Sequence, residues 1–297
     1  MMPEYDANIL VSADWLEEHL DEAKRDDPSL RVIEVDIDPS NYEGGHVPGA
    51  GSFDWKRDLQ DTVTFDVPTS ENFETLLGEA GVTPDSTIVL YGDMMNWFAA
   101  HAYWLLTYYG HTDVRLLNGG RDYWTVKEYP LTDDVPTFTT RSYTVASELN
   151  TDIRADRKDV ERAMEQDTPM VDVRTPEEYR GEILAPPGWN EGVQRGGHIP
   201  GAVNIPWSRV VEADGRFKSP ADLHDLFAAE GIERVGEDTD AITYCRIGER
   251  SALVWTVLHE LLGYEHIRNY YGSWVEWGNT VGAPIEGGRR ADVHSDR

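Results

Sequence analysis

Three things are scarce in this sequence of 297 residues: cysteine, lysine and long hydrophobic runs. The single cysteine, Cys245, excludes an internal disulfide and a zinc site built from several thiolates. No apolar run reaches the roughly 18 residues of a membrane-spanning helix, and residues 1–30 lack the basic and apolar regions of a secretion signal. These absences predict a soluble cytoplasmic protein.

Positive charge is also in the minority. Asp and Glu number 55 against 26 Lys and Arg, which gives a formal net charge of -29 at pH 7. Binding to the phosphate backbone needs an excess of cations, so the composition argues against a nucleic-acid partner. Acidity along the whole chain is typical of a halophilic surface adapted to high salt, where mutual repulsion is screened. An ordinary acidic cytosolic protein is the alternative.

What the sequence does contain is an internal repeat. The motif GGHVPGA at residues 44–50 returns as GGHIPGA at residues 196–202, an offset of 152. Residues 86–124 match residues 240–277 at an offset of 153. A nearly constant offset over such a distance indicates a duplicated domain, and two domains of roughly 150 residues agree with the length of the chain.

Each copy alternates short β-branched runs with segments of helical period, which predicts an α/β fold with a mostly parallel sheet covered on both faces. The predicted helices Phe98–Tyr109 and Ser251–Leu262 end at Gly110 and Gly263, where a glycine cap is expected. The predicted strands are Arg31–Val35, Thr87–Tyr91, Met170–Val173 and Ala241–Tyr244.

Composition divides the chain further. Residues 130–152 are rich in Thr, Ser and Asp and show no sustained helical period, which predicts a linker between the copies. The predicted organisation is a first domain at 1–129, the linker at 130–152, a second domain at 153–285 and a tail at 286–297.

The segment ITYCRIGERSAL, residues 242–253, places Cys245 directly after a predicted strand and before a helix. The N–H groups of such a loop and the helix dipole favour an anion there, and Arg246 and Arg250 add full positive charges. These influences favour a nucleophilic thiolate. The alternative is that Cys245 is only a small buried hydrophobic residue.

Sulfurtransferases and cysteine phosphatases both use a thiolate in such a loop. A phosphatase needs an arginine six residues after the cysteine, so that its loop surrounds a tetrahedral phosphate. This chain has Ser251 there, with its arginine one residue earlier at Arg250. The shorter loop favours a carrier of a single sulfur atom over a phosphatase or an arsenate reductase.

The segments GGHIPGAVNIPW, YCRIGERS and NYYGSWVEW, in this order and spacing, resemble the rhodanese family. The duplicated arrangement is similar to tandem-domain thiosulfate sulfurtransferases from about Val11 to Pro284. The resemblance implies a five-stranded, mostly parallel sheet flanked by helices in each half. It also implies an inactive N-terminal copy and a catalytic loop in the C-terminal copy.

By the same resemblance, Cys245 is the catalytic sulfur carrier and Arg250 binds the substrate anion, with Ser251 as the polar residue that closes the loop. Arg180 and Arg195 lie in a segment that in this family borders the active site, so either is a candidate to hold an anionic substrate, although a surface role is as good an interpretation. The loop residues that the resemblance assigns to substrate binding are Arg246, Ile247, Gly248, Glu249 and Arg250.

The N-terminal copy departs from the pattern at the loop itself. Gly92 stands opposite Cys245, Asp93 opposite Arg246 and Trp97 opposite Arg250, which removes both the nucleophile and the anion site. Nearby, Arg121 stands opposite Trp274. We expect this copy to cover one side of an active cleft between the domains.

Several other residues favour structural roles. His46 and His198 occupy the same turn of the two copies, and because His46 lies in the copy without a nucleophile, we expect both to stabilise the turn. The same argument assigns structural roles to Asp36 and Asp172. The nine histidines show no ligand spacing, so no metal and no other cofactor is expected. The tryptophans that we expect mostly in the core are Trp97, Trp104, Trp124, Trp255, Trp274 and Trp277.

The favoured hypothesis is therefore a monomeric cytoplasmic enzyme that moves the outer sulfur of thiosulfate, through a Cys245 persulfide, to cyanide or a thiol. Two arginines near the nucleophile suit a dianionic donor. A 3-mercaptopyruvate sulfurtransferase shares the nucleophile and stays open as an alternative. A catalytically silent sulfur-relay or scaffold protein is a rival of another class, which the intact loop argues against.

Overall fold

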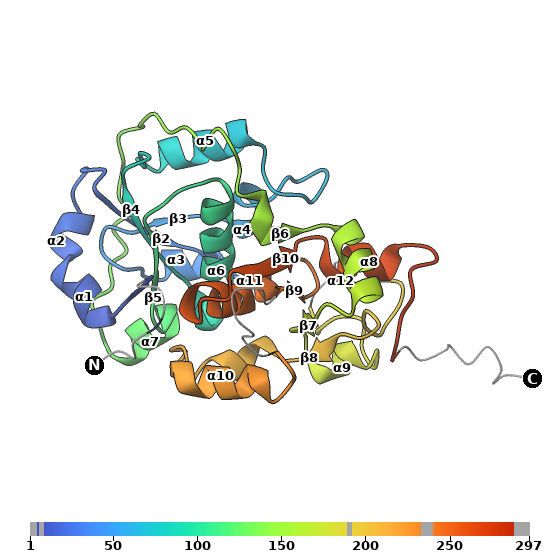
Figure 1. Ribbon diagram of the computed structural model, residues 1–297. Coiled ribbons are helices and arrows are strands. Elements are labelled where there is room, and N and C mark those ends of the chain that lie inside the picture. Colours follow the sequence, from blue (N-terminus) through green and yellow to red (C-terminus); the bar gives the residue numbers. More distant parts are fainter. Residues whose placement is uncertain (1–4, 6–8, 189–191, 233–239, 288–297) are drawn as a thin grey trace, which may run out of the picture.

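The computed structural model describes residue 5 and residues 9–188, 192–232 and 240–287. It consists of two α/β halves, each built on one five-stranded sheet (Figure 1). The strands of the N-terminal half are β1 (Leu10–Val11), β2 (Leu30–Glu34), β3 (Gly51–Ser52), β4 (Thr87–Tyr91) and β5 (Val114–Leu117). Those of the C-terminal half are β6 (Arg154–Ala155), β7 (Met170–Asp172), β8 (Val203–Asn204), β9 (Asp240–Tyr244) and β10 (His266–Tyr270).

The two sheets have the same topology. The strand order is β1-β5-β4-β2-β3 in one and β6-β10-β9-β7-β8 in the other, and all pairs among these strands are parallel. Strands β2, β4, β7 and β9 are buried almost throughout, as β-branched runs covered on both faces require. The predicted α/β fold in two copies is confirmed.

Helices cover both faces of each sheet (Figure 1). In the N-terminal half they are α1 (Ala13–Glu18), α2 (Leu20–Ala23), α3 (Ser40–Glu43), α4 (Trp55–Asp58), α5 (Ser70–Glu79), α6 (Asp93–Tyr108) and α7 (Gly120–Val126). In the C-terminal half they are α8 (Arg157–Gln166), α9 (Pro176–Tyr179), α10 (Pro220–Ala228), α11 (Glu249–Thr256) and α12 (Ser273–Asn279). A π-helical turn, Val257–Leu261, extends α11.

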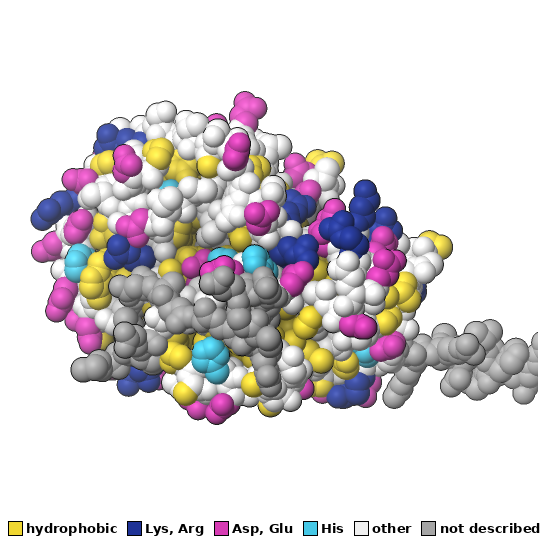
Figure 2. Space-filling model, viewed as in Figure 1, with side chains coloured by type: hydrophobic (Ala, Val, Ile, Leu, Met, Phe, Trp, Pro, Cys, Tyr) yellow, Lys and Arg dark blue, Asp and Glu magenta, His cyan; other side chains and the backbone are white. Residues whose placement is uncertain are grey.

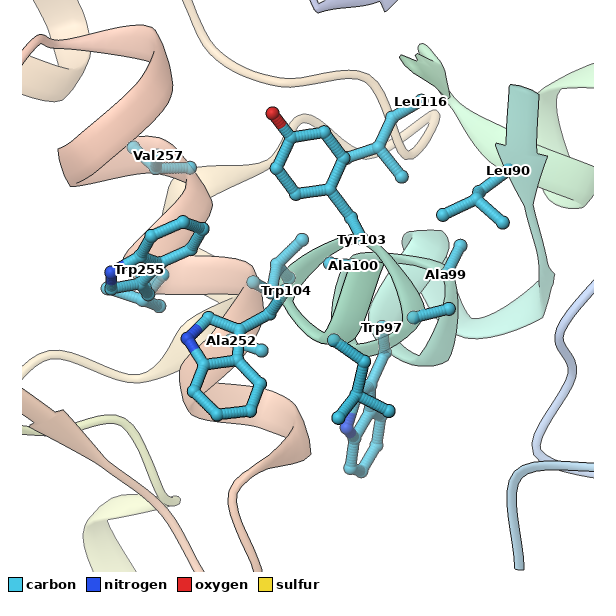
Figure 3. Close-up of a cluster of buried hydrophobic side chains, with 14 of the residues drawn as sticks. Leu90, Trp97, Ala99, Ala100, Tyr103, Trp104, Leu116, Ala252, Trp255 and Val257 are labelled. Carbon is cyan, nitrogen blue, oxygen red and sulfur yellow. The ribbon is translucent and has the colours of Figure 1, made fainter. Parts of the chain in front are cut away.

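The helices α6 and α11 occupy equivalent places in the repeat and pack against each other between the two sheets (Figure 1). Glycines follow them as predicted, since Gly110 and Gly263 both adopt left-handed conformations, with φ of 85° and 66°. Their side chains belong to one hydrophobic core that draws on both halves, with Trp104 and Ala252 among its members (Figure 3). The halves therefore share their main core.

The two repeated histidines have matching structural contacts. The ring of His46 stacks on Tyr42 with centroids 3.8 Å apart, and that of His198 stacks on Tyr179 at 3.6 Å. Each Nδ1 also hydrogen-bonds the carbonyl of its tyrosine, at 3.0 and 2.8 Å. This agrees with the predicted role of both histidines in stabilising the turn.

Residues 130–152 have little regular secondary structure and form hydrogen bonds with the N-terminal half. The Arg141 N–H donates to the Gly78 carbonyl at 2.9 Å, and the Ala146 N–H donates to the Tyr109 carbonyl at 3.0 Å. The segment thus forms backbone hydrogen bonds to one half rather than crossing open space. Of the predicted tail, residues 288–297 lie outside the described part of the chain.

Acidic side chains are spread over the surface, as the composition predicts. Figure 2 shows Asp and Glu over the viewed face, with Lys and Arg among them. Within the described residues, no helix combines the length and the apolar character that crossing a lipid bilayer requires.

The shared core generates a prediction about stability. Trp104 is fully buried and stacks on Tyr108 of its own half and on Tyr271 of the other half, with ring centroids 5.5 and 5.6 Å apart. We expect Trp104→Ala to lower the free energy of unfolding by about 3–5 kcal/mol. Because the halves share this core, we expect unfolding to remain a single transition in circular dichroism.

The control is Trp124→Ala, since Trp124 is equally buried but belongs to a smaller cluster within the N-terminal half. Two separate unfolding transitions in the wild-type protein, with Trp104→Ala moving only one of them, would contradict the shared core.

Candidate active site

Cys245 is the first residue after β9, at the carboxyl edge of the C-terminal sheet, and its side chain is fully buried. The helix α11 begins four residues later, at Glu249. Gly248 makes the tight turn between them with a left-handed φ of 96°, and a Cβ there would lie 2.9 Å from the Tyr271 carbonyl oxygen. We call residues 245–250 the cysteine loop.

The sulfur and the backbone of Cys245 are both held by hydrogen bonds. The Gly248 N–H donates to the Cys245 Sγ at 3.1 Å, an interaction that favours negative charge on the sulfur. The Cys245 N–H donates to Ser273 Oγ at 3.1 Å, and this hydroxyl donates to the Tyr270 carbonyl at 2.7 Å. The end of β10 and the start of α12 therefore hold the backbone of Cys245 in place.

The side chain of Ser251 closes the cysteine loop by binding a backbone carbonyl of the loop. Its hydroxyl lies 3.1 Å from the Gly248 carbonyl oxygen and 2.6 Å from Asn269 Oδ1. The Asn269 amide donates to the same Gly248 carbonyl at 3.0 Å. Because all three residues are buried, these bonds hold the carbonyl at the end of the turn in one orientation.

Arg250 forms a buried ion pair with Glu178 of α9. Its two terminal nitrogens donate to the two carboxylate oxygens at 2.8 and 2.9 Å, and the side chains are 4% and 0% exposed. Burial alone would lower the pKa of Arg250, but the hydrogen bonds and charge of Glu178 outweigh it and raise the pKa. For Glu178, burial is likewise outweighed by Arg250, which lowers its pKa. Both groups are charged at neutral pH.

A small pocket opens beside the cysteine loop. Its cavity volume is about 10 Å³, and it is lined by Trp97, Pro186, Arg246, Ile247, Glu249 and Arg250. Trp97 belongs to the N-terminal half, and its ring lies over the Arg250 guanidinium with 5.5 Å from the ring centroid to Cζ. The pocket is thus lined from both halves, as we expect for a site between them.

The charges around the pocket differ from the sequence expectation. Arg246 and Arg250 bring two positive charges, but Glu249 lines the same pocket and Glu178 pairs with Arg250. The four formal charges sum to zero. The loop is therefore not the site of two uncompensated positive charges that the sequence alone suggests.

The other two candidate arginines have partners of their own. The half-exposed Arg180 pairs with Glu182 at 2.9 Å and with Glu177 at 3.7 Å. Arg195 donates to the carbonyls of Gly278, Trp277, Thr280 and Ala283, and so holds the end of α12. Neither is among the described residues that line the pocket.

The equivalent loop of the N-terminal half, residues 92–97, has a different construction. The Gly92 N–H donates to Asn96 Oδ1 at 3.0 Å, and Asp93 accepts from the Ile37 N–H and the Asn41 amide, both at 2.9 Å. Three residues in succession, 94–96, have left-handed φ values between 47° and 68°. A side chain at position 92 has no room, because its Cβ would lie 2.1 Å from the Val35 carbonyl oxygen.

Buried carboxylates surround that second loop. Asp36 accepts the Asp93 N–H at 2.7 Å, and Glu34 pairs with Arg121, the residue opposite Trp274. Burial, together with the neighbouring Glu34, raises the pKa of Asp36 to about 8. Burial also raises the pKa of Asp93 to about 7. This environment disfavours a bound anion.

Comparison with known proteins agrees with this geometry. The model of the rhodanese-like domain matches residues 12–127 and again residues 156–280. The chain belongs to the rhodanese family. Among the described residues of this rhodanese, no three His, Cys, Asp or Glu side chains are grouped so that they could hold a metal ion.

Its relatives match over nearly their full lengths. A Haloferax volcanii protein provisionally named thiosulfate sulfurtransferase is 56% identical over 285 residues, which are 96% of this chain and 98% of the relative. The Thermus thermophilus sulfur carrier protein TtuD is 48% identical over 94% of this chain and 97% of its own. A Mycobacterium leprae protein, also provisionally named thiosulfate sulfurtransferase, is 47% identical over 94% of this chain and 98% of its own.

Solved structures share the fold. The anaerobic ergothioneine biosynthesis enzyme of Chlorobium limicola, bound to trimethyl histidine, has a TM-score of 0.82 at 25% identity and covers 96% of this chain and 72% of its own. A persulfide form of the enzyme EanB has a TM-score of 0.82 at 26% identity, with the same coverage.

Two site residues escaped the sequence analysis. Glu178 lies far from Cys245 in sequence, and its only signal is the helix-capping pattern with Thr175, which indicates a helix start rather than an ion pair. Trp97 was expected in the core. It is buried, but it also forms a wall of the pocket. The feature of the sequence that could have indicated this role of Trp97 is its position opposite Arg250 in the repeat.

The buried carboxylates generate a pH prediction. A carboxyl group has a pKa of about 4 in an unfolded chain, and the folded value of about 8 for Asp36 is higher. Its stabilising contribution is therefore complete below about pH 4 and is lost as the pH rises towards 8. The wild-type protein therefore loses free energy of unfolding between pH 5 and pH 8. We expect Asp36→Asn, which cannot ionise, to lose about 1–3 kcal/mol less by pH 8.

Urea denaturation between pH 5 and 8 measures the effect. Asp38→Asn is the control, because Asp38 is exposed and its hydrogen bonds from Ser40 lower its pKa instead. A difference between Asp36→Asn and wild type that stays constant over this pH range would contradict the raised pKa.

Proposed function

We propose that this rhodanese is a thiosulfate sulfurtransferase in which Cys245 carries the transferred sulfur. The observation that carries the proposal is the buried thiol at the end of β9, with the Gly248 N–H 3.1 Å from its sulfur. The provisional name of its Haloferax relative, at 56% identity, supports the same activity. The finer assignments below rest on this proposal.

In the first half-reaction, the Cys245 thiolate attacks the outer sulfur of thiosulfate. The new sulfur–sulfur bond forms on Cys245 as the bond within thiosulfate breaks, and the electron pair of that bond leaves with sulfite. Total charge is conserved, since a thiolate and a dianion give a persulfide anion and a dianion. No cofactor takes part in this step.

In the second half-reaction, an acceptor takes the outer sulfur and Cys245 leaves as a thiolate. The persulfide anion is stabilised by the N–H groups at the start of α11 and by the Arg246 charge beside them. Cyanide and small thiols are the proposed acceptors. The small size of the pocket, about 10 Å³, supports acceptors that present a narrow nucleophile.

The other residues of the cysteine loop, and Ser251 after it, receive roles in binding or in shaping the site. We assign anion binding to Arg250 and Arg246, and shaping of the pocket to Ile247 and Glu249. Gly248 and Ser251 fix the turn. The role of Arg180 in substrate binding stays a prediction, because its ion pairs are with Glu177 and Glu182.

A 3-mercaptopyruvate sulfurtransferase is the second candidate function. The observation that favours it is the zero sum of charges among Arg246, Arg250, Glu249 and Glu178. A neutral pocket discriminates less in favour of a dianion over a donor with one carboxylate.

The proposal includes a monomeric cytoplasmic protein adapted to high salt. It also includes a catalytic domain at 153–285, preceded by the linker at 130–152 and an inactive domain at 1–129, with a tail from 286. The core that the two halves share supports a monomer in which one copy covers the site of the other.

The first functional prediction is that Cys245→Ser folds normally but forms no persulfide. A neutral hydroxyl lacks the nucleophilicity of a thiolate, so we expect thiocyanate production from thiosulfate and cyanide to fall on the order of 10³-fold or more. Intact-mass spectrometry after mixing with thiosulfate gives the direct test. Wild-type protein should gain one sulfur atom and the variant none; a wild type that gains none overturns the proposal.

The second prediction concerns the N-terminal loop. A cysteine introduced by Gly92→Cys in the Cys245→Ser background should gain no sulfur. Its Cβ would meet the Val35 carbonyl, and the Asp93 carboxyl opposes a neighbouring anion. The same mass measurement checks it, with Gly92→Ala in the wild-type background as a test of folding. Sulfur at position 92 would show that the N-terminal copy still supports the chemistry.

A further inference from the structure

The Glu178–Arg250 pair determines which charge the pocket presents to a donor. Both terminal nitrogens of Arg250 are engaged by Glu178, and one face of the guanidinium lies against Trp97. A donor anion therefore meets an arginine whose charge is already balanced. To bind its terminal nitrogens, the anion must displace Glu178 or share them with it.

We infer that Glu178 is a specificity-determining residue that lowers the preference of the site for dianionic sulfur donors. The inference rests on the proposed sulfur transfer through Cys245. Glu178 acts through Arg250 and is a positioning residue. By supplying a buried negative charge, it reduces the attraction that two arginines would otherwise exert on thiosulfate.

The comparison of the two halves supports a role tied to the cysteine loop. Asn41 occupies the place of Glu178 in the repeat, directly before the tyrosine that stacks on the turn histidine. Asn41 donates its amide to Asp93 at 2.9 Å, and Asp93 occupies the place of Arg246. Each copy thus has at this position the group that complements its own loop: an acid beside arginines, an amide donor beside an acid.

A second buried ion pair of the same half offers a matched control. Arg174 and Asp172 are 1% and 0% exposed, and Arg174 lies over the Trp274 ring at 4.5 Å from its centroid. Neither residue is among the described residues lining the pocket. Asp172→Asn therefore removes an equally buried carboxylate charge from a pair that does not include Arg250.

The test variant is Glu178→Gln. Glutamine keeps the length of the side chain and can still accept the Thr175 N–H, which lies 3.1 Å from Glu178 Oε2, so the start of α9 is preserved. The only intended change is the loss of one negative charge beside Arg250, which makes the net charge around the pocket more positive by one unit. Arg250→Ala is a poorer test, because it also removes the guanidinium to which the donor anion would bind.

Two donors that differ mainly in charge provide the readout. Thiosulfate is a dianion, and methanethiosulfonate is its monoanionic analogue with a methyl group in place of one oxygen. We expect Glu178→Gln to raise kcat/KM about tenfold for thiosulfate and about threefold for methanethiosulfonate, because Coulomb energy is proportional to ligand charge. Most of the gain should fall on KM, since the added charge binds substrate and transition state alike.

The shorter Glu178→Asp keeps the negative charge but weakens its contact with Arg250, so a smaller change in the same direction is expected. It decides the question if Glu178→Gln fails to fold. Asp172→Asn should change both donors by the same factor. Equal factors for both donors in the Glu178 variants, or a loss confined to thiosulfate, would overturn the inference.

The outcomes separate this inference from the function on which it rests. Sulfur loading of wild-type Cys245 is measured first, by intact mass, with each donor. Loading by neither donor defeats the proposed function. Loading by both, with an unchanged donor ratio in the Glu178 variants, defeats the role of Glu178 alone.

Discussion

A buried ion pair joins two separate segments of the C-terminal half. Arg250 ends the cysteine loop, and Glu178 holds it from α9, an element that follows a different strand of the sheet. Trp97 of the N-terminal half covers the same guanidinium. Because a buried charge without a partner costs several kcal/mol, the position of Arg250 constrains the cysteine loop, α9 and the contact between the halves together.

The duplicated fold shows how one scaffold supports two opposite environments. Both loops follow the same strand of the same sheet topology. In one, a cysteine N–H is held by Ser273 and the neighbours are arginines; in the other, the Gly92 N–H is held by Asn96 and the neighbours are carboxylates. Parallel strand ends present N–H groups in both copies. Side chains on neighbouring segments then decide whether an anion is favoured there.

Much of this could be predicted from the sequence because the informative signals are local. A glycine-ended helix after a β-branched run gives the α/β order, and the repeat of GGHxPGA gives the duplication. The position of Cys245 between strand and helix follows from the same pattern. The balance of charge could not be predicted this way, since Glu178 lies 72 residues from Arg250 along the chain.

By itself, then, the sequence determined the α/β class, the two copies, the single thiol and the loop in which it lies, because hydrophobic period, turn residues and residue chemistry are properties of neighbouring positions. Only the tertiary structure decided the charge of the pocket and the identity of its walls. Glu178 and Trp97 contact Arg250, and Pro186 lines the same pocket, from three separate segments. Which side chains meet there depends on how the sheets and helices pack, and Coulomb and contact energies depend on distance in space rather than along the chain.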